Sequence, residues 1–132
     1  MEETEHIFTR TEACALLPRL RPLLEELRDE WGRVKSLNPE IQKTRDKAML
    51  DAFNPRGVEY VESVSHLMLV MSQIREIGVL VKDLDKGLID FPYLKDDHVV
   101  YLCWQLGEDS VDYWHGIDTG FSGRQPLSES DL

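Results

Sequence analysis

The fold is decided by residues 9–37, TRTEACALLPRLRPLLEELRDEWGRVKSL, in which apolar side chains return every three, four and seven positions. That period places them on one face of a long amphipathic helix. Thr9 and Glu12 open the stretch as a capping box, in which a hydroxyl and a carboxylate bond the free N–H groups of the helix start. The sequence therefore predicts a helix from about Arg10 to Leu37.

Two prolines, Pro18 and Pro22, oppose this prediction, because each removes a backbone donor and crowds the preceding turn at a cost of about 3 kcal/mol within a helix. Both fall on the face away from Leu20 and Leu27. There water can bond the freed carbonyl groups, and a bend can wrap the helix around a core. An alternative stays open, in which the helix starts again with Pro18 in its first turn.

A second helix is predicted from about Arg56 to Ile77, with Gly78 as its stop. The two pairs Asn38-Pro39 and Asn54-Pro55 each end one element and begin another, so they bracket a connector. The apolar face of the second helix is wider than one partner helix would cover, and we expect a second copy of the chain to complete a four-helix arrangement. Its apolar residues are Tyr60, Val61, Val64, Leu67, Met68, Met71, Ile74 and Ile77.

Beyond Gly78 the pattern changes to short extended runs separated by turns. Three strands are predicted, at 79–82, 88–91 and 99–105, and the third reads as central because it is apolar on both faces. Pro92 marks a strand end or a sheet edge. Residues 108–115 predict a short helix.

The predicted fold class is therefore α+β, with a hairpin of two long antiparallel helices, a small antiparallel sheet of about three strands and a short helix, dimerising through the helices. A chain of 132 residues fits one domain. Its predicted parts are a lead at 1–8, helices at 9–37 and 56–78, a connector at 38–55, a sheet and motif segment at 79–127, and a tail at 128–132 that is expected to fray.

Composition excludes several classes of function. The net charge of −10 opposes binding to nucleic acids and to anionic membranes. No run approaches the roughly 18 apolar residues of a membrane span, and no secretory leader is expected. Cys14 and Cys103 form no C-x-x-C pair, and a domain of this size needs no disulfide, so we expect a soluble protein with reduced thiols in the cytoplasm.

The candidate residues for binding or catalysis are concentrated in the last fifty residues. Asp90 lies between Ile89 and Phe91 in an apolar strand, where a carboxylate needs a partner, and His115 or Arg124 would supply one. Two interpretations stay open for Asp90, a structural salt bridge and a ligand contact. The ligand-binding candidates are Asp90, Trp104, Glu108, Trp114, His115, Asp118 and Arg124.

Carboxylates beside an imidazole can also ligate a divalent metal or share acid and base roles. On this ground Asp90, Glu108, His115 and Asp118 are metal-ligand candidates, although their spacing matches no known metal signature. Cys103 has no base beside it in the sequence and is expected to be an inert buried thiol. The cofactor stays unknown, and whether the chain is an enzyme stays open.

Three blocks of sequence together resemble a bacterial family catalogued as domain of unknown function 2203, over about residues 7–127 without the connector. The blocks are FTRTEACALLPRLRPLL (8–24), VKDLDKGLIDFP (81–92) and VYLCWQLGE (100–108), the last followed by WH (114–115) and GFSGRQP (120–126). The resemblance implies no mechanism, because that family has no established reaction, cofactor or partner. Its motif includes the positions of Asp90, Glu108, His115, Asp118 and Arg124, whereas Gly116 replaces an acidic residue.

Three functions are consistent with these observations. The first is a dimeric domain that binds a small polar or anionic ligand at the C-terminal motif segment, as a binding protein or an enzyme. The second is a structural or adaptor protein that pairs its long helices with another protein. The third is a metal-dependent hydrolase.

Overall fold

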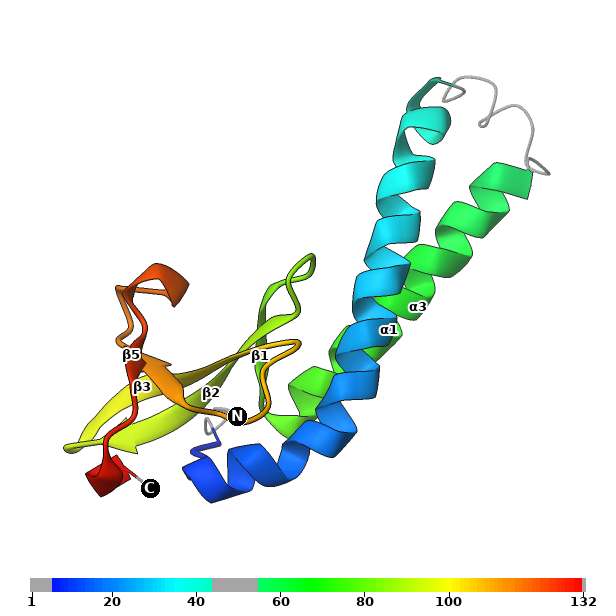
Figure 1. Ribbon diagram of the computed structural model, residues 1–132. Helices are drawn as coiled ribbons and strands as arrows, with labels where there is room; N and C mark the ends of the chain where they lie inside the picture. The colour runs from blue at the N-terminus through cyan, green and yellow to red at the C-terminus, as the bar shows by residue number, and fades with distance from the viewer. Residues whose placement is uncertain (1–5, 44–54, 132) are drawn as a thin grey trace, which may run out of the picture.

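The computed structural model describes residues 6–43 and 55–131 and consists of a long helical hairpin joined at one end to a twisted sheet (Figure 1). Among these residues, no helix is both long enough and apolar enough to cross a membrane. In chain order the elements are α1 (Arg10–Lys43), α3 (Pro55–Ile77), β1 (Leu80–Asp83), β2 (Leu88–Lys95), β3 (His98–Gln105), β4 (Tyr113–His115), the 3-10 turn η1 (Phe121–Gly123), β5 (Gln125–Pro126) and the 3-10 turn η2 (Glu129–Asp131).

The capping box forms as predicted. Glu12 Oε1 accepts a hydrogen bond from Thr9 N at 2.9 Å, and Thr9 Oγ1 accepts one from Glu12 N at 3.1 Å. α1 then runs without interruption through Pro18 and Pro22, so the alternative of a fresh start at Pro18 is wrong. Both prolines are exposed, and α1 bends in this part, toward the sheet (Figure 1).

The predicted end of the first helix at Leu37 is wrong, because α1 continues through Pro39 to Lys43. A proline removes one backbone hydrogen bond but keeps a helical φ, and the residues after it are good helix formers. The connector therefore begins later than expected, and its remainder at 44–54 lies outside the described residues.

α3 confirms the second predicted helix almost residue for residue. Gly78 ends it with a φ of +100°, a left-handed conformation that favours glycine, and its N–H donates to Arg75 O at 2.9 Å. Leu67, Val70 and Ile74 are buried against α1 and the sheet. Val61 and Met68, also on the predicted apolar face, are 62% and 64% exposed in the single chain.

The sheet is an antiparallel meander of five strands in the order β1-β2-β3-β4-β5, rather than the three predicted. β3 is the middle strand, as its composition indicated. The short helix predicted at 108–115 is wrong, because His115 pairs with Tyr101 and β4 extends the sheet. The partner strand provides backbone hydrogen bonds for a segment whose own helical pattern spans only two turns.

β2 does not stop at Pro92, as one alternative proposed, but crosses it and pairs with β3 to the end of the hairpin. Pro92 O accepts a hydrogen bond from Phe8 N at 2.8 Å. Because the N–H and C=O of one residue point to the same side of an antiparallel strand, the missing donor of Pro92 faces away from β3. Pro92 therefore lies on the edge of β2 beyond the reach of β1, which is the other alternative.

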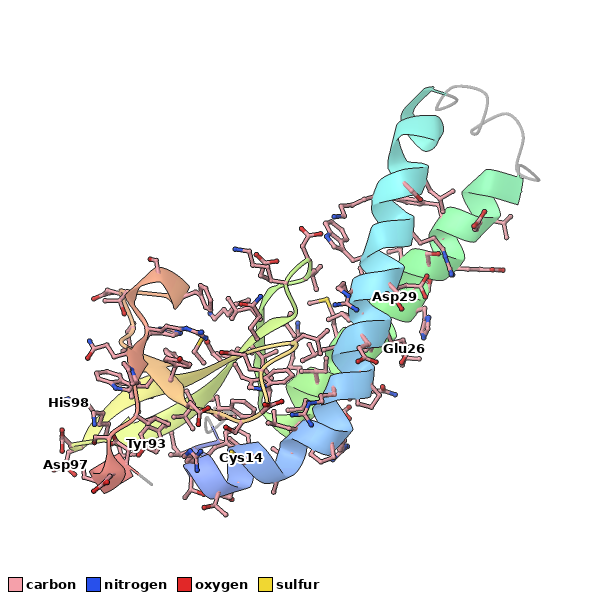
Figure 2. All side chains as sticks on the ribbon, in the orientation of Figure 1. Cys14, Glu26, Asp29, Tyr93, Asp97 and His98 are labelled. Atoms are coloured by element: carbon pink, nitrogen blue, oxygen red, sulfur yellow. The ribbon has the colours of Figure 1, made fainter. Side chains whose placement is uncertain are left out.

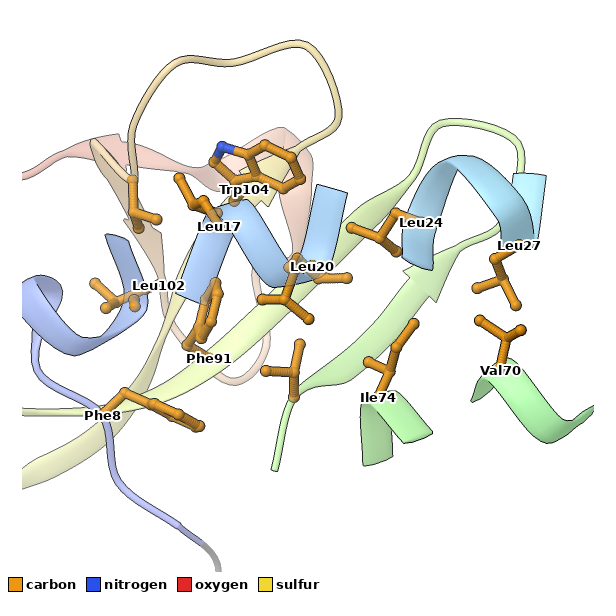
Figure 3. Packing of buried hydrophobic residues seen from close by; sticks show 14 of the residues in the cluster. Phe8, Leu17, Leu20, Leu24, Leu27, Val70, Ile74, Phe91, Leu102 and Trp104 are labelled. Carbon is orange, nitrogen blue, oxygen red and sulfur yellow. The ribbon is translucent and has the colours of Figure 1, made fainter. Parts of the chain in front are cut away.

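The hydrophobic core lies between one face of the sheet and the two helices (Figure 3). Ile89 and Phe91 of β2 and Trp104 of β3 point into it and are fully buried. Leu20 of α1 and Ile74 of α3 meet them from the other side (Figure 3). Side chains alternate along a strand, so the residues between these point to the opposite face of the sheet.

The expected fraying of residues 128–132 is wrong for the described part, 128–131. Asp131 accepts hydrogen bonds from Ser128 N at 2.9 Å and forms a salt bridge with Lys95 at 2.7 Å. Tyr93, near the far end of the β2–β3 hairpin (Figure 2), donates its hydroxyl to Asp131 O at 3.2 Å. The salt bridge with Lys95 lowers the pKa of Asp131 to about 2. These contacts dock the segment against the hairpin.

Candidate functional site

The register of three strands places reactive side chains together on the face of the sheet that points away from the helices. Asp90 of β2 pairs with Cys103 of β3, and Tyr101 of β3 pairs with His115 of β4. Asp90, Cys103 and His115 are all buried there, and their donor atoms lie within 4.8 Å of one another. We call these three residues the far-face cluster. Among the described residues, this is the group of His, Cys, Asp and Glu whose donor atoms converge in this way.

Asp90 finds the partner that its position requires. His115 Nε2 lies 2.9 Å from Asp90 Oδ2, and His115 and Asp90 are 4% and 1% exposed. His115 Nδ1 lies 2.7 Å from Gly116 O, and because a carbonyl oxygen only accepts, Nδ1 must carry the proton. Nε2 and an ionised Oδ2 would then both be acceptors. A hydrogen bond between them therefore requires one further proton, shared by the two atoms. Burial raises the pKa of Asp90 against the opposing effect of this hydrogen bond.

The second carboxylate oxygen of Asp90 has no partner among the described residues. Oδ1 is buried and makes no hydrogen bond with any residue that the structure describes. A buried polar atom without a partner costs about 1–3 kcal/mol of stability, and such atoms are rare in proteins. Oδ1 is therefore the feature of the cluster that structural packing alone does not explain.

Cys103 completes the cluster. The thiol is fully buried, and burial raises its pKa to about 11. This fits the expectation of an inert thiol when the residue is considered alone. Arg124 lies near Cys103, and its positive charge opposes the effect of burial on the pKa of the thiol.

A second charged pair, Arg124 and Glu108, lies near Cys103 of the far-face cluster. Arg124 Nη1 and Nη2 bond the two oxygens of Glu108 at 3.1 and 3.0 Å, a bidentate geometry. The guanidinium carbon lies 3.9 Å from the ring centre of Tyr113 and 4.5 Å from that of Phe121. These two rings hold Arg124 in place. The side chains of Arg124 and Glu108 remain 21% and 24% exposed, so solvent reaches the pair.

Glu108 also borders a surface hollow of about 350 Å³ beside α1. Arg21 and Arg28 lie on its helical side, and residues 106–109 on the other. Arg21 Nη2 donates to Asp109 O at 2.8 Å, which fastens this loop to α1. Glu108 is the residue that the hollow and the Glu108–Arg124 pair share.

Three of the predicted site residues lie elsewhere. Trp104 is on the opposite face of the sheet, in the core, where its Nε1–H donates to Glu108 O at 3.2 Å. Trp114 has Lys95 above its ring at 5.2 Å, and Asp118 is exposed. Asp118 therefore does not join Asp90 and His115, and Cys103 takes the place that the metal hypothesis gave to a carboxylate.

The position of Cys103 beside Asp90 was missed, although a signal for it exists. Asp96 and Asp97 have φ values of 50° and 66° and form a two-residue hairpin turn. Counting outward from that turn pairs Lys95 with His98 and Asp90 with Cys103. Both strands were predicted, so fixing the turn would have placed the thiol beside the carboxylate.

Comparisons with known proteins give one result. No match was found among the curated proteins or among the solved structures. A family model described as uncharacterized conserved protein (DUF2203) matches residues 6–127, which include both helices, the whole sheet and the far-face cluster. The chain belongs to this family of uncharacterized conserved proteins.

Proposed function

We propose that the chain binds a small ligand carrying a carboxylate or phosphate group, and that Arg124 is the residue that holds it. One observation carries this proposal: the planar fork of Arg124 is fixed between two aromatic rings, yet its partner is a solvent-accessible carboxylate of the same chain. A fork held in place loses little entropy when it binds a planar anion. Glu108 thus stands where the acid group of a ligand would lie.

Binding would replace one charge-assisted pair by another. A ligand carboxylate takes the two N–H groups of Arg124, and Glu108 turns toward the hollow, where it is hydrated. Because the guanidinium keeps a bidentate partner in both states, the exchange leaves no buried charge unpaired. Glu108 therefore acts as a competitor that weakens binding, and its removal should strengthen it.

Two substitutions with opposite expected effects test this proposal. Isothermal titration with inorganic phosphate and with succinate should show at least about tenfold tighter binding to Glu108→Gln than to the original chain, since an electrostatic competitor is gone. Arg124→Lys keeps the charge but loses the fork, and should bind at least about tenfold more weakly.

Asp109→Asn is the matched control, because it removes the same charge from the neighbouring, exposed position. It should leave affinity within about twofold of the original, as expected for a screened surface charge. An equal gain in anion affinity for Glu108→Gln and Asp109→Asn would show that the change in net charge alone explains the effect. Absence of binding to all variants, Glu108→Gln included, would end the proposal.

A second proposal concerns α3, whose exposed side carries Val58, Val61, Met68 and Leu69. We propose that this face pairs with α3 of a second copy in an antiparallel arrangement centred near Met68. That orientation places Glu59 and Glu62 of one copy near Arg75 of the other, whereas a parallel pair would set the acidic residues against each other. The free cysteines Cys14 and Cys103 support a cytoplasmic location for the dimer.

Analytical ultracentrifugation tests the dimer. Met68→Glu should weaken association at least about tenfold, because it places a charge in an apolar interface. Ile117→Glu makes the same change at another exposed apolar residue, and should leave the dimer intact. A monomer at every concentration, or equal effects of the two substitutions, would refute the dimer and favour a different protein as the partner of α3.

A further inference from the structure

The geometry of the far-face cluster points to a metal site: we infer that Asp90, Cys103 and His115 bind a divalent ion of the zinc class. This inference does not require anion binding at Arg124, because the three side chains that would bind the metal are different ones. It differs from the hydrolase hypothesis in its ligands, since Glu108 is held by Arg124 and Asp118 is exposed.

Distances between the donor atoms suit such an ion. Zinc binds sulfur at about 2.3 Å and nitrogen or oxygen at about 2.0–2.2 Å, so neighbouring ligands of a tetrahedral ion lie roughly 3.5 Å apart. The three donor atoms lie within 4.8 Å of one another. Small rotations of the side chains therefore close the site without moving the strands, whose pairing fixes the three Cα positions.

His115 is already oriented as a metal ligand. Histidines that bind metals usually donate the other ring N–H to a carbonyl or carboxylate, which fixes the ring and its tautomer. His115 Nδ1 makes this bond with Gly116 O at 2.7 Å, and Nε2 points toward Asp90 in the cluster. Arg124 is the cation near Cys103, and a nearby positive charge favours the thiolate form that binds a metal.

The unpartnered oxygen and the charge balance support the same conclusion. Asp90 Oδ1 is buried and makes no hydrogen bond with any described residue, so it is free to bind a cation within the cluster. A divalent ion with one thiolate, one carboxylate and one neutral imidazole has no net charge, which a buried site requires. Binding displaces the thiol proton and the proton shared by Asp90 and His115.

The mixture of ligands selects the metal. Sulfur and imidazole nitrogen favour zinc and similar transition metals over magnesium and calcium, which prefer oxygen alone. Three protein ligands leave one position of a tetrahedral ion for a water molecule, the pattern of zinc sites that do chemistry rather than only hold a fold together.

Two measurements test the inference. Protein purified without chelator should contain zinc in an amount approaching one ion per chain by mass spectrometry. Cobalt(II) added to the metal-free protein should produce the charge-transfer absorption of a thiolate–cobalt bond. Cys103→Ser and Cys103→Ala should remove that absorption and weaken cobalt binding at least about tenfold, with circular dichroism used to confirm that both variants are folded.

Cys14→Ser is the control, because Cys14 lies on the first turns of α1 and not in the sheet (Figure 2). It should retain the full absorption and affinity. No cobalt or zinc binding to the original chain would overturn the inference, and so would an absorption that survives both Cys103 substitutions. Titrations of the metal-free protein with phosphate and with succinate measure anion binding separately from metal binding. One proposal can therefore fail while the other holds.

Discussion

Phe8 and Phe91 should be energetically coupled, because their rings join the segment that leads into α1 to the middle of the sheet. The ring centres lie 5.3 Å apart at an interplanar angle of 79°, an edge-to-face contact, and the residues are 3% and 0% exposed. Replacing either with leucine removes three carbon atoms from the core. At about 0.8 kcal/mol per buried CH₂ group, each substitution should cost about 2 kcal/mol of the free energy of unfolding.

The double substitution should cost less than the sum of the two, because the ring contact is lost only once. Such aromatic pairs contribute about 0.5–1.5 kcal/mol beyond their buried area, so we expect a coupling of about 1 kcal/mol. Equilibrium unfolding in guanidinium chloride gives all four free energies, and each single substitution should lower the midpoint by roughly 0.5 M.

Ile7→Ala is the control for this cycle, since Ile7 is a neighbouring apolar residue on the exposed side. It should change the free energy of unfolding by less than about 0.5 kcal/mol. Strictly additive losses for Phe8 and Phe91 would show that the two rings act separately, and would refute the reasoning that their contact fixes the approach to α1.

Two further predictions concern the helices. Hydrogen bonding to Glu30 raises the pKa of His66, so its contribution to stability is complete below the ordinary pKa of 6.5 and is lost as the pH rises through the raised value. The melting temperature lost in His66→Gln should therefore be larger at pH 6 than at pH 8.5, and the same loss at both values, or a similar pattern in the exposed control His98→Gln, would refute this. Gly78→Ala should cost about 1–3 kcal/mol of the free energy of unfolding, because Gly78 has a φ of +100°. Gly32→Ala within α1 should instead stabilise the protein by about 0.5–1 kcal/mol, because an added methyl group meets no neighbouring atom there. Thermal melts in which both substitutions change stability in the same direction would contradict this.

The sequence predicts elements well where one strong periodic pattern decides them. The heptad spacing from Ala13 to Val34 and the stop at Gly78 place the helices, because both act within a few residues of where they are read. β4 could not be predicted in this way, because Tyr113–His115 is only three residues long and is extended only through its pairing with β3.

Prediction of the site is also limited, because it depends on how distant strands pair. Asp90 stands out because a carboxylate in an apolar strand needs a partner, and His115 was one of the two partners expected. Trp104 was placed in the site by its chemistry, but its position in β3 turns it to the opposite face from Cys103. The type of residue indicates what a side chain can do, whereas strand register decides what it meets.

The hydrogen bond from Phe8 N to Pro92 O has a consequence for aggregation. β2 extends beyond β1, and an uncovered strand edge is a template on which other chains can add. Phe8 occupies the first carbonyl of that edge, and Pro92 offers no N–H to an incoming strand. The segment that leads into α1 thus also protects the sheet from pairing with sheets of other molecules.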